Sequence, residues 1–96
     1  MRVGRQAPDL SITRQEICVM LTRALKAAIP SLNTSVTDPT VFADEDAIAD
    51  WAIIAVRYMN SRDIMTGVGG NTINPLGNTT REQAIALVLR TYEAFL

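Results

Sequence analysis

Apolar residues recur at spacings of three and four over three separate stretches of this chain, a pattern typical of amphipathic helices. The stretches cover residues 13–29, 47–60 and 81–96. Acidic residues crowd the start of the second stretch, where they suit the positive end of a helix. The third stretch is apolar over so wide an arc that we expect its helix to be central. We therefore predict an all-α fold, a small helical domain of helix–loop–helix units with three main helices and short turn-rich connectors.

The two connectors between these stretches differ in character. Residues 31–41 are polar and contain Asp38-Pro39, which indicates an exposed loop. Residues 63–78 hold several glycines, which permit positive φ, together with apolar side chains that can pack inward. The apolar side chains of this second connector are Ile64, Val68 and Ile73. We predict an ordered, turn-rich segment there.

Composition excludes several kinds of active site. The chain has no histidine and one cysteine, Cys18, so imidazole bases, Cys/His dyads, zinc clusters and an internal disulfide are ruled out. A net charge of −1 gives no general attraction to nucleic acid or acidic membranes. No apolar run approaches the roughly 18 residues of a membrane span, and the N-terminus lacks the apolar stretch of a signal peptide. We expect no cofactor and no metal, and Cys18 as a small buried residue.

Two helix starts repeat one another along the chain. Thr-Arg-Gln-Glu at residues 13–16 matches Thr-Arg-Glu-Gln at residues 80–83, a separation of 67 residues from Thr13 to Thr80. In both copies the threonine can cap the helix while the fourth residue reaches back to the amide of the capping residue. This reciprocal arrangement is a capping box, so each copy predicts a helix start.

The capping box does not account for the arginine that follows each threonine. Arg14 and Arg81 add positive charge to the positive end of a helix, at a cost of about 0.3–1 kcal/mol. One interpretation is that each arginine, together with free helix amides, binds a carboxylate or phosphate group. The other is a structural ion pair with an acid such as Asp44 or Asp46.

A series of short motifs follows in a fixed order between Phe42 and Phe95: Phe42-Ala43-Asp44, Ile48-Ala49-Asp50-Trp51-Ala52, Ala55-Val56, Asp63-Ile64-Met65-Thr66-Gly67, Gly69-Gly70-Asn71-Thr72-Ile73-Asn74-Pro75 and Thr79-Thr80-Arg81-Glu82-Gln83. In this order the chain resembles one repeat of the S-layer homology (SLH) family. The resemblance divides the chain into three parts. Residues 1–11 are an N-terminal extension or a remainder of the expressed sequence, residues 12–30 the closing helix of a preceding repeat, and residues 42–96 one full repeat.

The resemblance implies a non-catalytic module that anchors an exported bacterial protein to the cell surface. Such modules bind a secondary cell wall polysaccharide, often bearing a pyruvate ketal, without a covalent bond. An extracellular location is then expected, and the missing signal peptide indicates that the chain is an excerpt. The family usually works as three tandem repeats with glycan grooves between neighbours. The expected partners are therefore cell wall polysaccharide and either neighbouring repeats or a homo-oligomer, with no nucleic acid and no membrane insertion.

On this basis four side chains are assigned roles in a glycan site. Arg14 and Arg81 would bind the ketal carboxylate, Trp51 would stack on a sugar ring, and Asp44 would accept sugar hydroxyls. Each assignment has a structural alternative: ion pairs for the arginines, a place in the core for Trp51, and an N-terminal helix acid or cap for Asp44.

Backbone groups near Gly67 and Gly69 complete the candidate site. They would come close to the ligand, because a glycine leaves room beside its backbone. Their alternative role is to form turns.

Other functions fit the sequence less well. Asp46 and Asp50 are one helical turn apart, but no nucleophile with a base accompanies them, so we predict no enzyme. The third helix lacks the basic face of a DNA-reading helix, and residues 44–46 lack the ligand spacing of a calcium loop. The competing hypothesis is a helical protein–protein interaction or oligomerisation module without glycan binding. Replacing Arg81 with alanine separates the two, because loss of glycan binding with folding intact favours the anchor.

Overall fold

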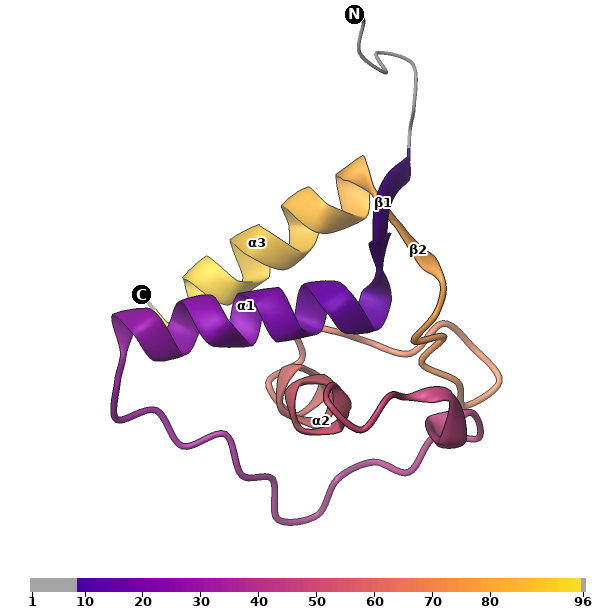
Figure 1. Ribbon diagram of the computed structural model, residues 1–96, viewed down its shortest axis with the longest axis horizontal. Coiled ribbons are helices and arrows are strands. Elements are labelled where there is room, and N and C mark those ends of the chain that lie inside the picture. Colours follow the sequence, from indigo (N-terminus) through magenta and orange to yellow (C-terminus); the bar gives the residue numbers. More distant parts are fainter. Residues whose placement is uncertain (1–8, 96) are drawn as a thin grey trace, which may run out of the picture.

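The computed structural model describes residues 9–95 (Figure 1). Residues 1–8 of the predicted N-terminal extension and Leu96 of the predicted third helix lie outside the described residues. In chain order the elements are β1 (Asp9–Thr13), α1 (Arg14–Ala28), the 3-10 turn η1 (Glu45–Ala47), α2 (Ile53–Ser61), β2 (Asn78–Thr80) and α3 (Arg81–Phe95).

Helices dominate the fold as predicted, but the fold is not purely α-helical. β1 and β2 form a two-stranded antiparallel sheet in which Asp9 pairs with Thr80 and Thr13 with Asn78. β2 is only three residues long, which is too short for the alternation of apolar and polar residues from which a strand is predicted. The prediction of an all-α domain is therefore correct for the helices and wrong for these two strands.

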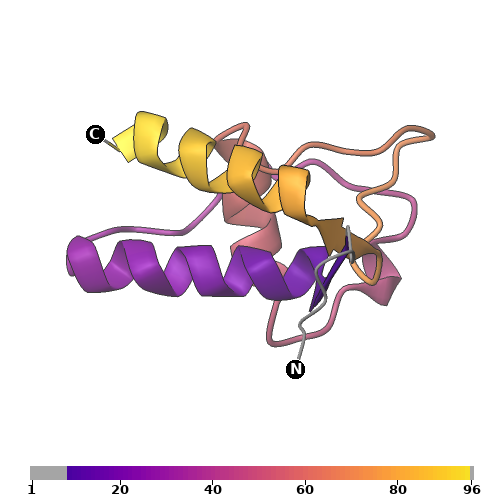
Figure 2. The same cartoon turned by 90° about the horizontal axis from the view of Figure 1, so that it is seen from above.

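The small sheet determines how the two long helices are arranged. β1 runs directly into α1 and β2 directly into α3, so the pairing of the strands brings the two helix starts together. From there α1 and α3 run side by side in the same direction, and α2 crosses α1 at a steep angle (Figures 1 and 2).

The second helix is shorter than predicted and begins later. The acidic segment forms the 3-10 turn η1, and α2 begins only at Ile53, with no acidic residue in its first turn. Ile48 is buried in extended conformation, and the N–H of the next residue, Ala49, donates to Oε1 of Gln15 in α1 at 2.9 Å. This tertiary contact interrupts the stretch that the apolar spacing predicts as one continuous helix.

The core lies where α1, α2 and the turn-rich segment meet. Met59 of α2 and the segment's Ile64, Met65 and Ile73 are all fully buried. The segment is therefore ordered as predicted, and two of its three apolar side chains point inward. The third, Val68, is exposed, so its predicted inward packing is wrong.

The third helix is peripheral, which corrects the prediction that it is central. Only Leu87 and Thr91 of α3 are buried. The core cluster draws mainly on α1, α2 and the turn-rich segment, so α3 closes one side of it with Leu87. Four large apolar residues on α3 are exposed: Ile85, Val88, Leu89 and Tyr92.

Candidate functional site

Both repeated helix starts form the predicted capping box. At α1 the Thr13 N–H donates to Glu16 Oε1 at 2.7 Å, and the Glu16 N–H donates to Thr13 Oγ1 at 3.2 Å. At α3 the Thr80 N–H donates to Gln83 Oε1 at 3.0 Å, and the Gln83 N–H donates to Thr80 Oγ1 at 3.1 Å. At α3 the neutral amide of Gln83 thus takes the place that the Glu16 carboxylate has at α1, and both make the same pair of hydrogen bonds.

Arg14 is buried and holds the turn-rich segment through its backbone. Its Nε donates to the carbonyl of Ile73 at 2.9 Å and its Nη2 to the carbonyl of Thr66 at 2.7 Å. Burial lowers the pKa of this guanidinium, an effect that the neighbouring Cys18 and Asp44 oppose. No carboxylate of residues 12–95 lies within ion-pair distance of Arg14, and the ion pair among these side chains joins Arg57 to Glu45. The predicted alternative of an Arg14 ion pair is therefore wrong.

Asp44 holds the same segment from the other side. Its Oδ1 accepts the N–H of Ile73 at 3.0 Å and its Oδ2 accepts the N–H of Asn74 at 2.8 Å. Partial desolvation alone would raise the pKa of Asp44, but these backbone donors and the positive Arg14 outweigh it, so the pKa is lowered. Asp44 is the N-cap residue of η1 by position, but its side chain makes no capping hydrogen bond to this turn.

Arg14 opens onto a hollow of about 210 Å³ between the turn-rich segment and α3. A second guanidinium, that of Arg90, also lines the hollow, and its Nη1 donates to the carbonyl of Ile64 at 3.2 Å. No acidic residue is among the lining residues, so an anion would meet two cations and no like charge. The full lining is Arg14, Met65, Thr66, Gly67, Val68, Gln83, Ala86, Leu87 and Arg90.

The two glycines have different structural roles, and only Gly67 lines this hollow. A side chain at Gly67 would place its Cβ 2.9 Å from the carbonyl oxygen of Thr72 and 3.4 Å from the Phe42 ring, so the close backbone approach requires glycine. Gly69 has φ +109°, lies at an exposed turn, and does not line the hollow. The alternative role of turn-former is thus supported for Gly69, whereas Gly67 is required by the close approach of the backbone.

Trp51 lies on a different side of α1 from the Arg14 hollow. Its side chain is 61% exposed, so the alternative that places it in the core is wrong. The reason is that α2 begins after it, and the fully buried residue at this point is Ala52. Trp51 lines a separate hollow of about 370 Å³ on α1, together with Ile12, Glu16, Val19, Met20 and Arg23.

Arg81 is placed apart from the other candidates. It is exposed, makes no ion pair within the described part of the chain, and lines neither of the two hollows. The structure thus brings Arg14, Asp44 and Gly67 together around the turn-rich segment. Trp51, Gly69 and Arg81 lie elsewhere.

The sequence pattern does not identify two residues that shape the surroundings of the candidate site, Gln15 and Arg90. Gln15 is buried and fixes the segment before Trp51 through its bond to Ala49. Nothing in the spacing marks it, because its partner lies 34 residues away. Arg90 lines the Arg14 hollow, and its signal was the arginine that recurs 67 residues after Arg23.

Two further classes of site are absent from the described part of the chain. No group of three His, Cys, Asp or Glu side chains there is placed to hold a metal ion. No helix among these residues combines the length and the apolarity needed to cross a bilayer. Burial raises the pKa of the Cys18 thiol to about 12 despite the nearby Arg14, so this cysteine is a packing residue as predicted.

Comparisons with known proteins bear on this arrangement. The profile of the S-layer homology domain matches residues 41–85. An amylopullulanase from Thermoanaerobacterium thermosulfurigenes is 33% identical over 86 residues, which cover 88% of this chain and 5% of that protein. Exoglucanase XynX from Acetivibrio thermocellus is 32% identical over 81 residues, which cover 84% of this chain and 7% of that protein. No solved structure gives a significant match. The chain therefore corresponds to a small part of the length of either relative.

Proposed function

Because the chain carries an S-layer homology domain at residues 41–85, we propose that it anchors a larger exported protein to the bacterial cell surface by binding a cell wall polysaccharide. S-layer homology domains are non-catalytic and in general anchor proteins to the cell wall. The small share of each relative that the chain spans supports a module within a longer protein. In that protein residues 12–30 would close a preceding repeat and residues 42–96 would form the next.

The observation that carries the glycan-binding part of the proposal is the exposure of Trp51. A tryptophan that is 61% exposed contributes little to the core, and here it forms a wall of a hollow that also contains Glu16 and Arg23. An aromatic face flanked by polar side chains suits a sugar ring, whose C–H face stacks while its hydroxyls hydrogen-bond. This hollow is the proposed sugar subsite.

The Arg14 hollow would take an acidic substituent such as the carboxylate of a pyruvate ketal. Arg14 has five N–H donors, and two atoms, Nε and Nη2, already donate to carbonyls. The N–H groups that remain, together with Arg90, supply positive charge at the hollow. Asp44 and Gly67 shape the wall by holding the turn-rich segment, and Asp44 keeps lone pairs for a sugar hydroxyl. Gly69 and Arg81 line neither hollow, so they would contact the polysaccharide outside them, Gly69 through its backbone and Arg81 through a second carboxylate.

The test is a pull-down of the chain with Gram-positive cell wall sacculi, before and after chemical removal of the wall polysaccharide. Trp51→Ala should weaken binding about tenfold, equivalent to roughly 1.4 kcal/mol, because the stacking surface is lost. Tyr92→Ala is the matched control, since Tyr92 is an aromatic residue of nearly the same exposure on another surface.

Two results would contradict the proposal. One is binding that survives removal of the polysaccharide, and the other is equal binding by both alanine variants and the parent chain. Thermal unfolding of each variant establishes that a lost interaction does not reflect a lost fold.

The second candidate function is a helical interaction module without glycan binding. The exposed apolar residues of α3 favour it, because large apolar side chains on one helix face mark a contact surface. A folded chain that does not bind sacculi would support this candidate.

A further inference from the structure

Two more hollows continue the hollow lined by Trp51 along the surface of α1 and α2. The first has a volume of about 210 Å³, shares Val19, Arg23 and Trp51 with the Trp51 hollow, and reaches Ile54. The second has a volume of about 290 Å³ and is lined by Ile54 and Arg57. We call this last one the Arg57 hollow. Because neighbouring hollows share wall residues, the three form one trough.

The trough is longer than a single sugar ring requires. The Trp51 hollow alone has a volume of about 370 Å³, which is already the size of a small-molecule pocket. Trp51 and Ile54 are each 61% exposed, so they form an open apolar floor between the first hollow and the last. A polysaccharide strand with one ring stacked on Trp51 would therefore continue past Ile54 to the Arg57 hollow.

The trough has more positive than negative charge. Arg23 and Lys26 line its middle hollow, and Arg57 lines the last one. Among the lining residues the acid is Glu16, in the Trp51 hollow, and its Oε1 already accepts two hydrogen bonds from the residue that caps α1. Asp50 precedes Trp51 but lines none of the three hollows. Negative charge on a bound strand would thus be attracted.

Arg57 differs from Arg14 in what its guanidinium contacts. The Arg14 guanidinium makes two short hydrogen bonds to backbone carbonyls. The Nε of Arg57 is buried without a hydrogen-bond partner within residues 9–95, and its Nη2 lies 3.9 Å from Glu45 Oε1. This distance exceeds the roughly 2.7–2.9 Å of a charge-assisted hydrogen bond, and the pair is partly exposed, so it adds little stability. These contacts therefore do not explain an arginine at this position.

The loop between α1 and η1 adds two hydroxyl groups to the Arg57 hollow. Thr34 and Ser35 line it beside Arg57. The Asn33 side chain orders the loop at this point, because its Oδ1 accepts the N–H of Ser35 at 2.9 Å. A guanidinium accompanied by hydroxyl donors suits the oxygen atoms of a carboxylate or phosphate group.

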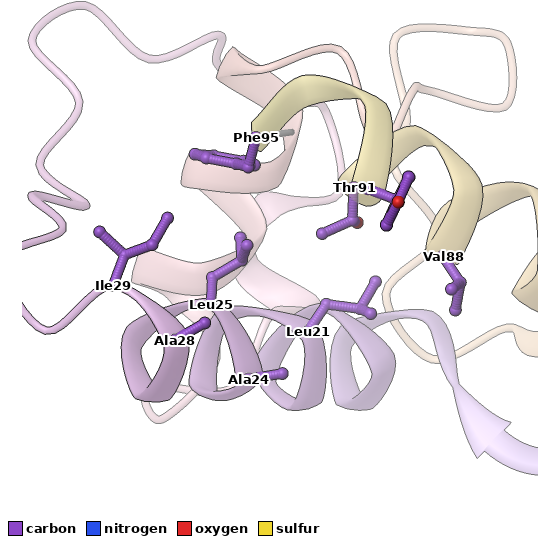
Figure 3. A pocket seen from close by; sticks show the side chains of 9 residues that line it. Leu21, Ala24, Leu25, Ala28, Ile29, Val88, Thr91 and Phe95 are labelled. Carbon is purple, nitrogen blue, oxygen red and sulfur yellow. The ribbon is translucent and has the colours of Figure 1, made fainter.

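The groove between α1 and α3 is a poor alternative site for an anionic strand. It is larger, with a volume of about 400 Å³, but its lining is almost entirely apolar and includes Leu21, Leu25 and Phe95 (Figure 3). No charged residue is among the residues that line it. An anionic group would lose its water there without gaining a partner.

We propose that the Arg57 hollow is an anion subsite for a sugar further along the strand than the one on Trp51. The inference rests on the proposed glycan binding and adds the class of polysaccharide, namely one with negative charge on internal sugars as well as on a terminal ketal. Arg57 donates to the oxygen atoms of a carboxylate or phosphate, and the hydroxyls of Thr34 and Ser35 donate beside it. Lys26 attracts the strand from the middle hollow.

The test measures the affinity of the chain for polysaccharide released from Gram-positive sacculi, after mild acid has removed the ketals. Arg57→Gln should weaken binding about fivefold at about 0.05 M salt and much less at about 0.5 M, because salt screens an exposed charge. Lys26→Gln should act in the same way, by about twofold. Arg62→Gln is the matched control, since it removes the same charge at the end of α2 and lines none of the three hollows.

Glu45→Gln should change the affinity in the opposite direction. It removes the carboxylate that competes for Arg57, so binding should strengthen about twofold at the lower salt concentration. A purely structural ion pair predicts no gain in binding. The melting temperature of each variant shows whether its fold is retained.

Amidation of the ketal-free polysaccharide distinguishes the two anions, because it neutralises carboxylates and leaves phosphates charged. A difference between the parent chain and Arg57→Gln that disappears on amidation identifies a carboxylate, and one that persists identifies a phosphate.

Equal affinities of Arg57→Gln and Arg62→Gln at both salt concentrations would overturn the inference. So would a parent affinity that salt does not change, or binding that disappears entirely with the ketals. The proposed function survives each of these results, because stacking on Trp51 does not need a charged sugar. A chain that does not bind untreated sacculi would instead contradict the proposed function and this inference together.

Discussion

The starts of α1 and α3 share a threonine, an arginine and a capping box, yet they occupy different environments. Arg14 is buried and bound to two backbone carbonyls, whereas Arg81 is exposed. The local geometry repeats because capping depends on four consecutive residues. The environment does not repeat, because it depends on which distant segment packs against the helix. A motif therefore fixes a helix start but does not by itself determine the role of its arginine.

The largest expected difference between the two helix starts is in the stability lost when each arginine is replaced. Arg14→Ala deletes two charge-assisted hydrogen bonds and leaves two carbonyls unpaired, so we expect the free energy of unfolding to fall by about 3 kcal/mol. Arg81→Ala removes an exposed side chain and should change it by less than about 0.5 kcal/mol. Urea unfolding of both variants measures the difference. Equal losses would show that the two arginines have equivalent structural roles.

The next largest effect is expected from Met20 of α1 and the residue 67 positions later, Leu87 of α3. Leu87→Ala leaves a cavity beside the core and should cost about 2 kcal/mol, the low end of the range for leucine because α3 packs on one side only. Met20→Ala should cost less than about 0.5 kcal/mol, because the side chain is already exposed. Thermal and urea unfolding test this pair. A large loss for Met20→Ala would mean that both faces of α1 carry stability in this chain.

The capping threonines should show no contrast at all. Thr13→Ala and Thr80→Ala each remove one hydroxyl acceptor at a helix start, so each should cost about 1 kcal/mol. Denaturant unfolding of the two variants should give the same loss within error. A clear difference would show that the capping boxes, like the arginine sites, depend on the segment that packs against each helix.

The smallest expected effect is the pH dependence of stability that Asp44 contributes. Its pKa is lowered in the folded state, so the unfolded chain takes up the proton more readily. The resulting stability is complete above the ordinary carboxyl pKa of about 3.9 and is lost as the pH falls through the lower folded value. Melting temperatures measured between about pH 5 and pH 2 should fall more for the parent than for Asp44→Asn. Equal changes of melting temperature with pH in the two proteins would show that Asp44 does not contribute this pH-dependent stability.

Local rules predicted much of this fold. The spacing of apolar residues and the capping boxes place α1 and α3 within one residue of their observed bounds. They also identify the turn-rich segment as ordered, with Ile64 and Ile73 buried. These features depend on residues close together in the sequence, so they can be predicted from the sequence alone.

The remaining features depend on contacts between distant residues. The bond from Ala49 to Gln15 ends the helical conformation before Trp51, and thereby exposes a ring that its apolar spacing predicts as buried. The same limit applies to the candidate site, because the carbonyls that bind Arg14 lie 52 and 59 residues away. The wide apolar arc of α3 was misleading for another reason. Apolar spacing indicates that a face is suited to burial, but it does not establish that any segment of residues 9–95 packs against that face.

The small sheet has a consequence for the geometry of repeated helix starts. Because β1 and β2 pair, with a register shift between Asp9 and Thr13, and lead directly into α1 and α3, they set the rotation and translation that relate the two helices. If one such operation were repeated, it would generate either a closed ring, where the rotation divides a full circle evenly and the translation is zero, or an open spiral. The symmetry of such an array would thus be determined by a hydrogen-bonded contact only a few residues long.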